Sequence, residues 1–271
     1  SCALLSGRIS IPDETGGCTE IMRRIRRRNK VKRLNITILL LAGFLLSVFC
    51  LVIRFADYAS GRKEYRQLQE QLEAFADSLS NQTEEWNWNR EEEEEEDEWT
   101  RLMTSRNPDY VFWLWIPGTN ISYPVVKNTI PGYYLNHTFS GKENPCGSIF
   151  CGEGAENLII YGHNMKDGSM FGDLKQYINE DYFREHRYIM IYCQGDWQRY
   201  MIFSCYIIRE EEVGVYQSYF NSEEEKRTYL NNIERKSLYL TGKQPEITDS
   251  IITLSTCMGK GKRVIVQAVL L

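Results

Sequence analysis

A cysteine, a histidine and an arginine stand at the ends of stretches that indicate β-strands. Cys257 ends the run "SIITLSTC", His163 ends "NLIIYGH", and Arg263 opens "RVIVQAVLL". A thiolate can attack a carbonyl carbon, a nearby imidazole can exchange the proton, and a guanidinium or a backbone N–H can stabilise the oxyanion that develops. The three residues therefore predict nucleophilic chemistry at a carbonyl group.

The other candidates for chemistry have simpler interpretations. His137 and His186 are interpreted as structural histidines, because nothing in their surroundings marks a partner in a site. Lys260 and Lys262 stand on the turn after the cysteine, where lysines are usually solvated. The candidate catalytic residues therefore remain the cysteine, the histidine and the arginine at the strand ends.

The chain has eight cysteines, and five of them follow the acidic stretch near residue 90: Cys146, Cys151, Cys193, Cys205 and Cys257. An odd number leaves at least one thiol unpaired within a monomer, and we expect that one to be Cys257. Cys146 and Cys151 could bridge across a turn, although small buried thiols are the simpler interpretation. No CxxC pair or His–Cys cluster has the spacing of a metal site, so we expect neither a metal nor another cofactor.

Eight short stretches after residue 101 are rich in β-forming residues and are separated by turn residues. They are "YVFWLWIPG", "ISYPVVK", "GSIFC", "NLIIYGH", "YIMIYC", "QRYMIFSCYIIR", "SIITLSTC" and "RVIVQAVLL". The "QGDW" between the fifth and the sixth predicts a hairpin turn. So many short strands without alternating helices favour an all-β barrel or sandwich over a parallel α/β sheet.

One helix is predicted before the strand that leads to the cysteine. Ser222 and Glu225 have the spacing of a capping box, which marks a helix N-terminus. In the helix that follows, Tyr229, Leu230 and Ile233 share one face. This helix therefore interrupts the late strands as an insertion.

The N-terminal part predicts a membrane anchor. Residues 34–53 carry no charged side chain, and twenty helical residues span the roughly 30 Å of a hydrocarbon core. Eight Lys/Arg and no acid lie within residues 23–33, so the positive-inside rule predicts a cytoplasmic N-terminus and an extracellular remainder after Arg54. A cleaved signal peptide is the alternative, but no A-x-A-like cleavage site follows; a buried core helix would not be apolar all round. Met22 directly precedes the basic cluster, so residues 1–21 are interpreted as either genuine chain or a mis-assigned extension.

Two segments separate the predicted span from the strands. In residues 57–80, apolar residues recur at helical spacing (Leu68, Leu72, Phe75 and Leu79), which predicts a stalk helix, with a coiled-coil dimer as the alternative. Residues 81–99 are dominated by acids, ten of them within residues 84–98, and predict a solvated spacer. The expected domains are therefore a basic N-terminus (1–33), an anchor (34–53), a stalk and spacer (54–100) and a catalytic domain (101–271).

Several motifs together resemble the signature of the sortases. "TLSTC" at residues 253–257, "YGH" at residues 161–163 and an arginine opening the next strand occur in the order typical of that family. The runs "YGHNMKDGSMFGDLKQY" and "YYLNHTFSGKENPCGSIF", together with the helix near residues 222–235, resemble class B sortases in particular. The resemblance covers roughly residues 105–271.

The resemblance implies an eight-stranded sortase barrel and a transpeptidase of the thiol-protease type. Such an enzyme cleaves a C-terminal sorting motif after its Thr, holds the protein as a thioacyl-enzyme, and passes it to an amine of a peptidoglycan precursor or cross-bridge. It implies that Cys257 is the nucleophile, His163 the general acid/base, and Arg263 the group that steadies the substrate carbonyl or oxyanion. It also suggests groove residues, namely Tyr161, Ser255, Thr256 and Leu135, and a groove wall formed by residues 209–236.

One departure from the class B pattern stands beside the cysteine. Class B sortases usually carry a longer loop between Cys and Arg, often with acids after the Cys, whereas this chain has only "MGKGK". Three alternatives use the same residues: a cysteine hydrolase, a pilus-polymerising sortase whose acceptor is a lysine, and a membrane-tethered binding module without activity.

The expected partners follow from this interpretation. They are surface proteins with a sorting motif, a cell-wall amine, and membrane lipid through residues 34–53. No nucleic-acid partner is expected. The expected localisation is a single-pass cell-membrane protein of the kind that anchors surface proteins in Gram-positive bacteria, with its catalytic domain outside.

Overall fold

The computed structural model describes residues 15–81 and 97–271, and the predicted acidic spacer lies largely outside the described residues. The chain divides into two compact units, residues 1–56 and residues 57–271. In the first unit, described from Thr15 onward, the chain forms the N-terminal part of helix α1 (Thr15–Asn81). This part contains an apolar stretch long enough to cross a membrane, and none of that stretch is buried. Residues 34–53 are therefore helical, as expected, and the helix is a candidate membrane span by its length and composition.

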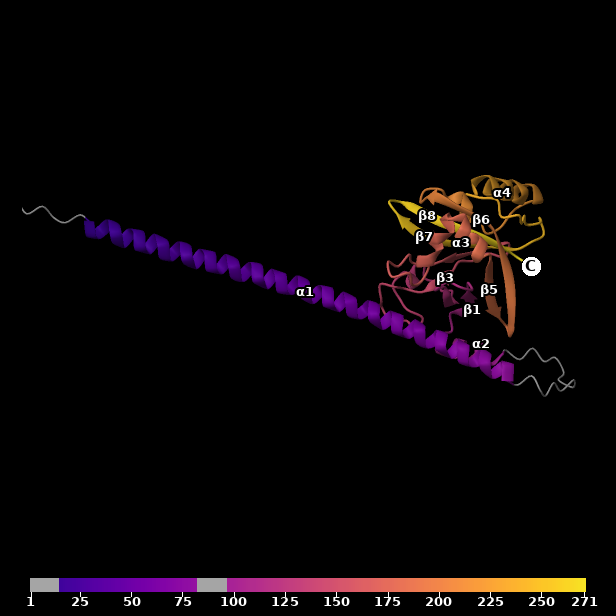
Figure 1. Ribbon diagram of the computed structural model, residues 1–271, viewed down its shortest axis with the longest axis horizontal. Coiled ribbons are helices and arrows are strands. Elements are labelled where there is room, and N and C mark those ends of the chain that lie inside the picture. The colour runs from indigo at the N-terminus through magenta and orange to yellow at the C-terminus, as the bar shows by residue number, and fades with distance from the viewer. Residues whose placement is uncertain (1–14, 82–96) are drawn as a thin grey trace, which may run out of the picture. The chain divides into compact units, whose positions relative to one another are not determined.

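The second unit is a closed β-barrel with a few short helices (Figure 1). Its strands are β1 (Tyr110–Trp115), β2 (Ser122–Val126), β3 (Ile149–Cys151), β4 (Asn157–Tyr161), β5 (Tyr188–Cys193), β6 (Asp196–Arg209), β7 (Ile251–Gly259) and β8 (Lys262–Leu270). Its helical elements, besides the end of α1, are α2 (Glu98–Arg106), η1 (Tyr133–Leu135), η2 (Gly172–Ile178), α3 (Glu180–Glu185), η3 (Val213–Tyr216) and α4 (Glu223–Lys236). All eight predicted strands are present, and the barrel alternative is confirmed over the sandwich.

The strands follow the order β1-β2-β3-β4-β7-β8-β6-β5 around the barrel. The β2–β3 and β4–β7 pairs are parallel, and the other pairs are antiparallel. Between β5 and β6, Gln194 and Gly195 both have positive φ (52° and 87°), as a two-residue type I′ turn requires. The hairpin turn predicted from "QGDW" is therefore confirmed.

Alternate residues of β7 and β8 face two different cores. Ile252 and Leu254 of β7 belong to the barrel interior, whereas Ile251 packs in a second cluster with Tyr229 and Ile233 of α4. The helix begins as predicted, because the Ser222 side chain accepts a hydrogen bond from the Glu225 N–H. α4 and η3 thus cover the outer face of the sheet formed by β6, β8 and β7.

A buried polar network joins this covering layer to the sheet. Asn157 accepts a hydrogen bond from the Thr253 hydroxyl (2.6 Å) and donates one to the Tyr229 hydroxyl (2.9 Å). Gln267 donates to the same two hydroxyls, at 2.8 and 3.0 Å. Since Asn157, Thr253 and Gln267 are fully buried, each polar group depends on the others for its partners.

Replacing Asn157 by alanine is expected to lower the free energy of unfolding by about 3 kcal/mol, because hydroxyls of Thr253 and Tyr229 lose a buried partner. Urea unfolding measures this change. The control is Asn221→Ala, which removes an amide that contacts Glu225 at the surface, and should cost less than about 0.5 kcal/mol. Equal losses in the two variants would contradict the prediction.

The C-terminal part of α1 belongs to the barrel unit and is not a free stalk. Tyr65, Leu68 and Leu72 are buried in the same core as the barrel strands, together with Trp99 and Met103 of α2. The helix therefore buries one apolar face, as predicted, and this face packs against the barrel. Trp99, assigned above to the end of the solvated spacer, packs against Trp113 with ring centroids 5.7 Å apart.

Candidate active site

The cysteine and the histidine come together because β4 and β7 run parallel in register. Tyr161, the last residue of β4, pairs with Ser255 of β7. Residues that are two positions further along each strand remain level in a parallel pair, and alternate residues share a face. His163 therefore lies beside Cys257, at the same end of the barrel sheet.

Side-chain bonds extend this register beyond the end of β4. The Thr256 hydroxyl donates to the Gly162 carbonyl (2.8 Å), and Asn164 donates from its side chain to the Cys257 carbonyl (2.7 Å). Thr256, predicted as a groove residue, is fully buried, so its side chain holds the two strands together. Asn164 was not predicted from the sequence, because an asparagine after a histidine carries no distinctive spacing.

The arginine lies opposite the cysteine on the neighbouring strand. Arg263 of β8 is the antiparallel partner of Cys257, and paired residues project to the same face. The Arg263 side chain is 29% exposed, and its guanidinium lies 3.6 Å from a carboxylate oxygen of Glu210. Cys257 and Arg263 are therefore paired on β7 and β8, and His163 follows the end of the neighbouring strand β4.

The loop between them is a tight hairpin. β7 continues to Gly259 and β8 begins at Lys262, so only Lys260 and Gly261 form the turn, both with positive φ (55° and 67°). Lys260 and Lys262 are exposed, as solvated turn lysines are expected to be. The short "MGKGK" interval therefore brings Arg263 back to the level of the cysteine.

The imidazole of His163 is oriented by a backbone carbonyl. Its Nε2 atom lies 2.6 Å from the Leu135 carbonyl oxygen. A carbonyl can only accept, so Nε2 carries the proton and Nδ1 of the neutral ring has the free lone pair. The Leu135 carbonyl thus orients the imidazole, as a carboxylate often does in other sites. The Leu135 side chain itself is 49% exposed.

An aromatic row borders the three residues. Tyr161 stacks on Phe150 (centroids 5.4 Å apart) and lies 5.9 Å from the ring of Tyr216 in η3. The hydroxyls of Tyr216 and Ser255 are hydrogen-bonded at 2.9 Å. Burial raises the pKa of both tyrosines above the ordinary value, and the positive charge of Arg263 acts in the opposite direction. Both hydroxyls therefore remain protonated donors beside the thiol at neutral pH.

Tyr216 was not singled out from the sequence. It lies within residues 209–236, which were expected to form a groove wall, but one tyrosine in that insertion has no spacing signal. Its hydroxyl contact to Ser255 brings the insertion onto β7, two residues before Cys257. The expected wall is therefore adjacent to the cysteine strand.

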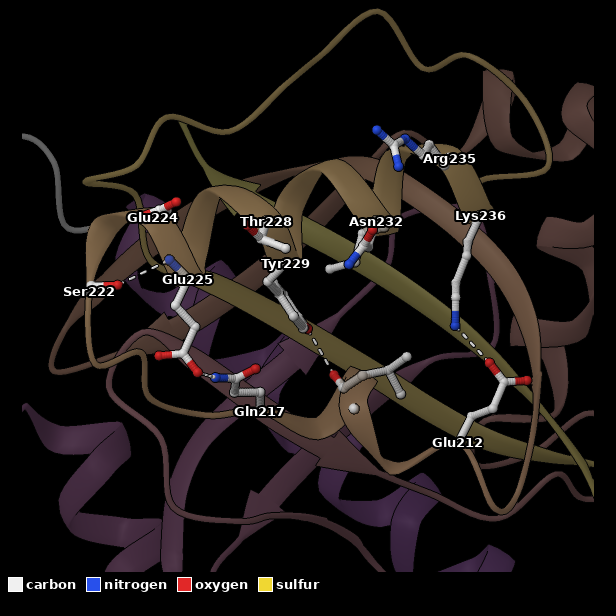
Figure 2. Close-up of a pocket in the computed structure, with 13 residues that line it drawn as sticks. Glu212, Gln217, Ser222, Glu224, Glu225, Thr228, Tyr229, Asn232, Arg235 and Lys236 are labelled. Atoms are coloured by element: carbon white, nitrogen blue, oxygen red, sulfur yellow. Dashed lines mark hydrogen bonds and ion pairs between the residues drawn. The ribbon is translucent and has the colours of Figure 1, made fainter.

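A separate cleft of about 780 Å³ lies on the other side of this wall, between η3 and α4 (Figure 2). Figure 2 shows two of the contacts across it: Lys236 pairs with Glu212 (2.7 Å), and the Gln217 side chain donates to the Glu225 carboxylate (2.6 Å). None of the predicted site residues lines it. This cleft is therefore separate from the surroundings of Cys257.

Cys146, Cys151 and Cys205 are buried, whereas Cys257 is partly exposed. Six cysteines are unpaired, namely Cys50, Cys146, Cys151, Cys193, Cys205 and Cys257. Burial raises the pKa of Cys146 to about 12, of Cys151 to about 11 and of Cys205 to about 12. In residues 15–81 and 97–271, no three His, Cys, Asp or Glu side chains gather as a metal site would require.

Alkylation with iodoacetamide at pH 8 is therefore expected to modify Cys257 while Cys146, Cys151 and Cys205 stay unmodified. A thiol reacts as its thiolate, and at pH 8 a thiol with a pKa near 11 is ionised in only about one molecule in a thousand. Peptide mass mapping of the folded protein measures the order of labelling. Labelling of the three buried thiols as fast as Cys257 would contradict the prediction.

Comparison with known proteins gives a consistent result. Residues 114–271 match the family model of the sortase domain. Sortase B of Listeria monocytogenes is 34% identical over 157 residues, which are 56% of this chain and 63% of that protein. The match thus spans just under two thirds of the length of that relative.

Two solved structures have the same fold. Sortase B of Clostridium perfringens is 32% identical, with a TM-score of 0.61, and the match covers 63% of this chain and 98% of that one. Sortase B of B. anthracis, solved in complex with AAEK1, is 30% identical, with a TM-score of 0.67 and coverage of 80% and 99%. With the barrel, the strand register and the matched domain in agreement, the chain belongs to the sortase family, and the relatives that it matches are sortases of class B.

Proposed function

We propose that this chain is a membrane-anchored cysteine transpeptidase that cleaves a sorting motif after its Thr and transfers the protein to a cell-wall amine. The observation that carries the proposal is the register of three strands. The parallel pairing of β4 with β7, which extends to Tyr161 and Ser255, supports a position of His163 near Cys257, and the pairing of Cys257 with Arg263 in the β7–β8 hairpin supports a role for the arginine. This arrangement supports attack of the thiol on a carbonyl group with a proton acceptor and a cation close by.

In the first step, the proton of the Cys257 thiol passes to Nδ1 of His163. The sulfur attacks the carbonyl carbon of the Thr, a C–S bond forms, and the carbonyl oxygen becomes an oxyanion. Arg263 donates hydrogen bonds to this oxygen. The C–N bond then breaks, and His163 returns its proton to the leaving amine. The product is a thioester on Cys257.

In the second step, an amine takes the place of the leaving group. His163 accepts a proton from the incoming amine, whose nitrogen attacks the thioester carbon. The C–S bond breaks, and the sulfur recovers a proton from His163. Bonds and protons balance over the two steps, and no oxidant, reductant or metal takes part.

The partly exposed side chains around Cys257 support a groove for the sorting motif. Tyr161 and Tyr216 offer ring faces and hydroxyl groups, and the exposed Leu135 side chain lies near the imidazole. Ser255 bridges to Tyr216 and fixes that wall of the groove. We assign Thr256 a supporting role through its bond to Gly162.

We also propose that residues 34–53 span the membrane with the basic N-terminus in the cytoplasm and the barrel outside. Substrate proteins that are held in the same membrane would meet the barrel at a raised effective concentration. The apolar helix of spanning length, the one found within residues 15–81 and 97–271, supports this arrangement.

The test uses the full chain in detergent micelles with peptides bearing NPQTN-like, LPXTG-like and scrambled motifs. Intact mass spectrometry reports a thioacyl adduct, and Cys257→Ala is the control. Triglycine is then added as the amine. We expect an adduct with one motif, no adduct in the variant, and transfer of the acyl group to triglycine.

The other outcomes each contradict part of the proposal. An adduct that is lost only to water, whichever amine is offered, indicates a cysteine hydrolase. Transfer to a lysine-bearing peptide in preference to triglycine indicates a polymerising sortase. No adduct with any peptide indicates a binding module without activity.

A further inference from the structure

We propose that the part of α1 that packs on the barrel is a positioning element for His163 and that Tyr65 is its principal contact. This inference rests on the proposed function, because it assigns the helix a part in the same reaction. Residues 57–81 precede the matched sortase domain, which begins at residue 114. The argument therefore starts from contacts outside the matched domain.

The Tyr65 hydroxyl is buried and has three partners on one loop. It donates to the Gly147 carbonyl (2.7 Å), lies 2.9 Å from the Ser148 hydroxyl, and accepts from the Phe139 N–H (3.2 Å). Tyr65 itself is only 4% exposed. A buried hydroxyl with three partners fixes the position of each, because none can turn to water instead. Tyr65 therefore holds the loop between β2 and β3 against the helix.

The same loop carries the carbonyl that orients the imidazole. Ser148 donates from its backbone N–H to the Tyr134 carbonyl (2.9 Å), one peptide group before Leu135. Gly147 has φ +57°, and a Cβ there would lie 2.6 Å from the Leu135 carbonyl oxygen. The Gly147–Ser148 backbone thus lies directly against the peptide groups of Tyr134 and Leu135. The route from Tyr65 to His163 therefore consists of three hydrogen bonds, Tyr65–Gly147, Ser148–Tyr134 and Leu135–His163, joined by two dipeptides of backbone.

Neighbouring residues of the helix bind the same loop. The Glu64 carboxylate accepts from the backbone N–H and the hydroxyl of Ser140, at 2.9 and 3.1 Å. The Asp57 carbonyl accepts from the Asn144 side chain (2.6 Å). Two full turns of the helix therefore fix the loop, with Tyr65 as its buried contact.

A second, weaker contact reaches His163 from the other direction. Arg62 lies 3.3 Å from Asp167, which belongs to the loop that follows the histidine. That loop returns to it, because the Phe171 N–H donates to the His163 carbonyl (2.9 Å). An exposed ion pair of this kind contributes little by itself. It does, however, mean that the β2–β3 loop and the loop after His163 both contact α1.

The helix can position His163 because the imidazole is hydrogen-bonded to the Leu135 carbonyl, which lies on a loop. A carbonyl orients the ring only as well as its loop is held, and η1, which contains Leu135, is a single short turn. Misplacement of a reacting group by about 1 Å can cost a hundredfold in rate. Fixing the loop through Tyr65 therefore fixes the proton on Nε2 and the free lone pair on Nδ1.

The test compares wild-type full chain in detergent micelles with Tyr65→Phe, which removes only the hydroxyl. The chain is labelled with ¹⁵N-histidine, and ring ¹⁵N shifts report which nitrogen carries the proton; His137→Gln and His186→Gln assign the remaining signal. We expect the Nε2–H tautomer in the wild type and a mixture of tautomers in Tyr65→Phe. We also expect thioacylation to slow by about tenfold in kcat with little change in KM.

The matched control is Tyr239→Phe, which removes another buried hydroxyl bound to a carbonyl, that of Tyr177 (2.8 Å). It should lose thermal stability to a similar degree and leave the His163 tautomer and kcat unchanged. A wild-type tautomer with wild-type kcat in Tyr65→Phe, or the same changes in Tyr239→Phe, would overturn the inference. If the wild type forms no thioacyl adduct, the proposed function fails, but the tautomer still decides the positioning role.

Discussion

A chain that begins at residue 97 is expected to unfold at a much lower temperature than a chain that begins at Asp57. The shorter chain lacks Tyr65, Leu68 and Leu72, which are buried in the barrel core. Burial of side chains of this size contributes about 2 kcal/mol each, so about 6 kcal/mol is lost. For a domain of this size, that loss lowers Tm by roughly 10–20 °C.

Calorimetry of the two chains measures the difference, and the wild-type full chain gives the reference. Leu68→Ala in the chain that begins at Asp57 should fall between them, with a loss of about 3 kcal/mol. Equal Tm values for the chains that begin at residues 57 and 97 would show that the helix is a stalk, as first predicted from the sequence.

Replacing Arg263 by alanine is expected to slow formation of the thioacyl-enzyme by about 100-fold to 1000-fold, the usual effect of removing an oxyanion donor. Stability should change little, because the guanidinium is partly exposed and its ion pair with Glu210 is long. Arg263→Lys should recover only part of the rate, since an ammonium lacks the planar fork of a guanidinium. Single-turnover mass spectrometry with the preferred peptide measures the rates.

Lys262→Ala is the matched control for this loss of positive charge. Lys262 is exposed and directly precedes Arg263 in β8, and successive residues of a strand face opposite sides. Its rate should stay within about threefold of the wild type, as is usual for surface substitutions away from a site. Equal losses in Arg263→Ala and Lys262→Ala would indicate that only net charge matters.

Much of the fold could be predicted because turn residues and a helix-capping residue mark where the strands and the helix begin or end. The glycine and lysine turn after Cys257 and the "QGDW" turn both mark strand ends, and Ser222 marks a helix start. The three candidate catalytic residues were predicted for the same reason, since each stands at a strand end. Their adjacency depends on the β4–β7 pairing, which no local pattern specifies.

Two kinds of contact could not be predicted: the packing partner of an apolar helix face, and hydrogen bonds made by backbone atoms. The stripe of Leu68 and Leu72 indicates that a helix buries one face, but it does not indicate whether the partner is a second helix or a barrel. The Leu135 carbonyl orients His163 as a backbone group, and every residue has one. Tyr216 and Asn164 act through contacts between segments that are distant in sequence, so neither has a spacing that marks it.

The position of β8 between β6 and β7 determines when in folding the proposed nucleophile gains its partners. The thiol and the imidazole meet through a parallel pair whose bonded residues, Gly162 and Thr256, are 94 positions apart. Pairings between such distant segments form slowly, in about milliseconds to seconds. Until β8 inserts, β7 is an edge strand and no arginine lies opposite Cys257. Until the barrel closes, the chain therefore lacks the arrangement on which the proposed reaction depends.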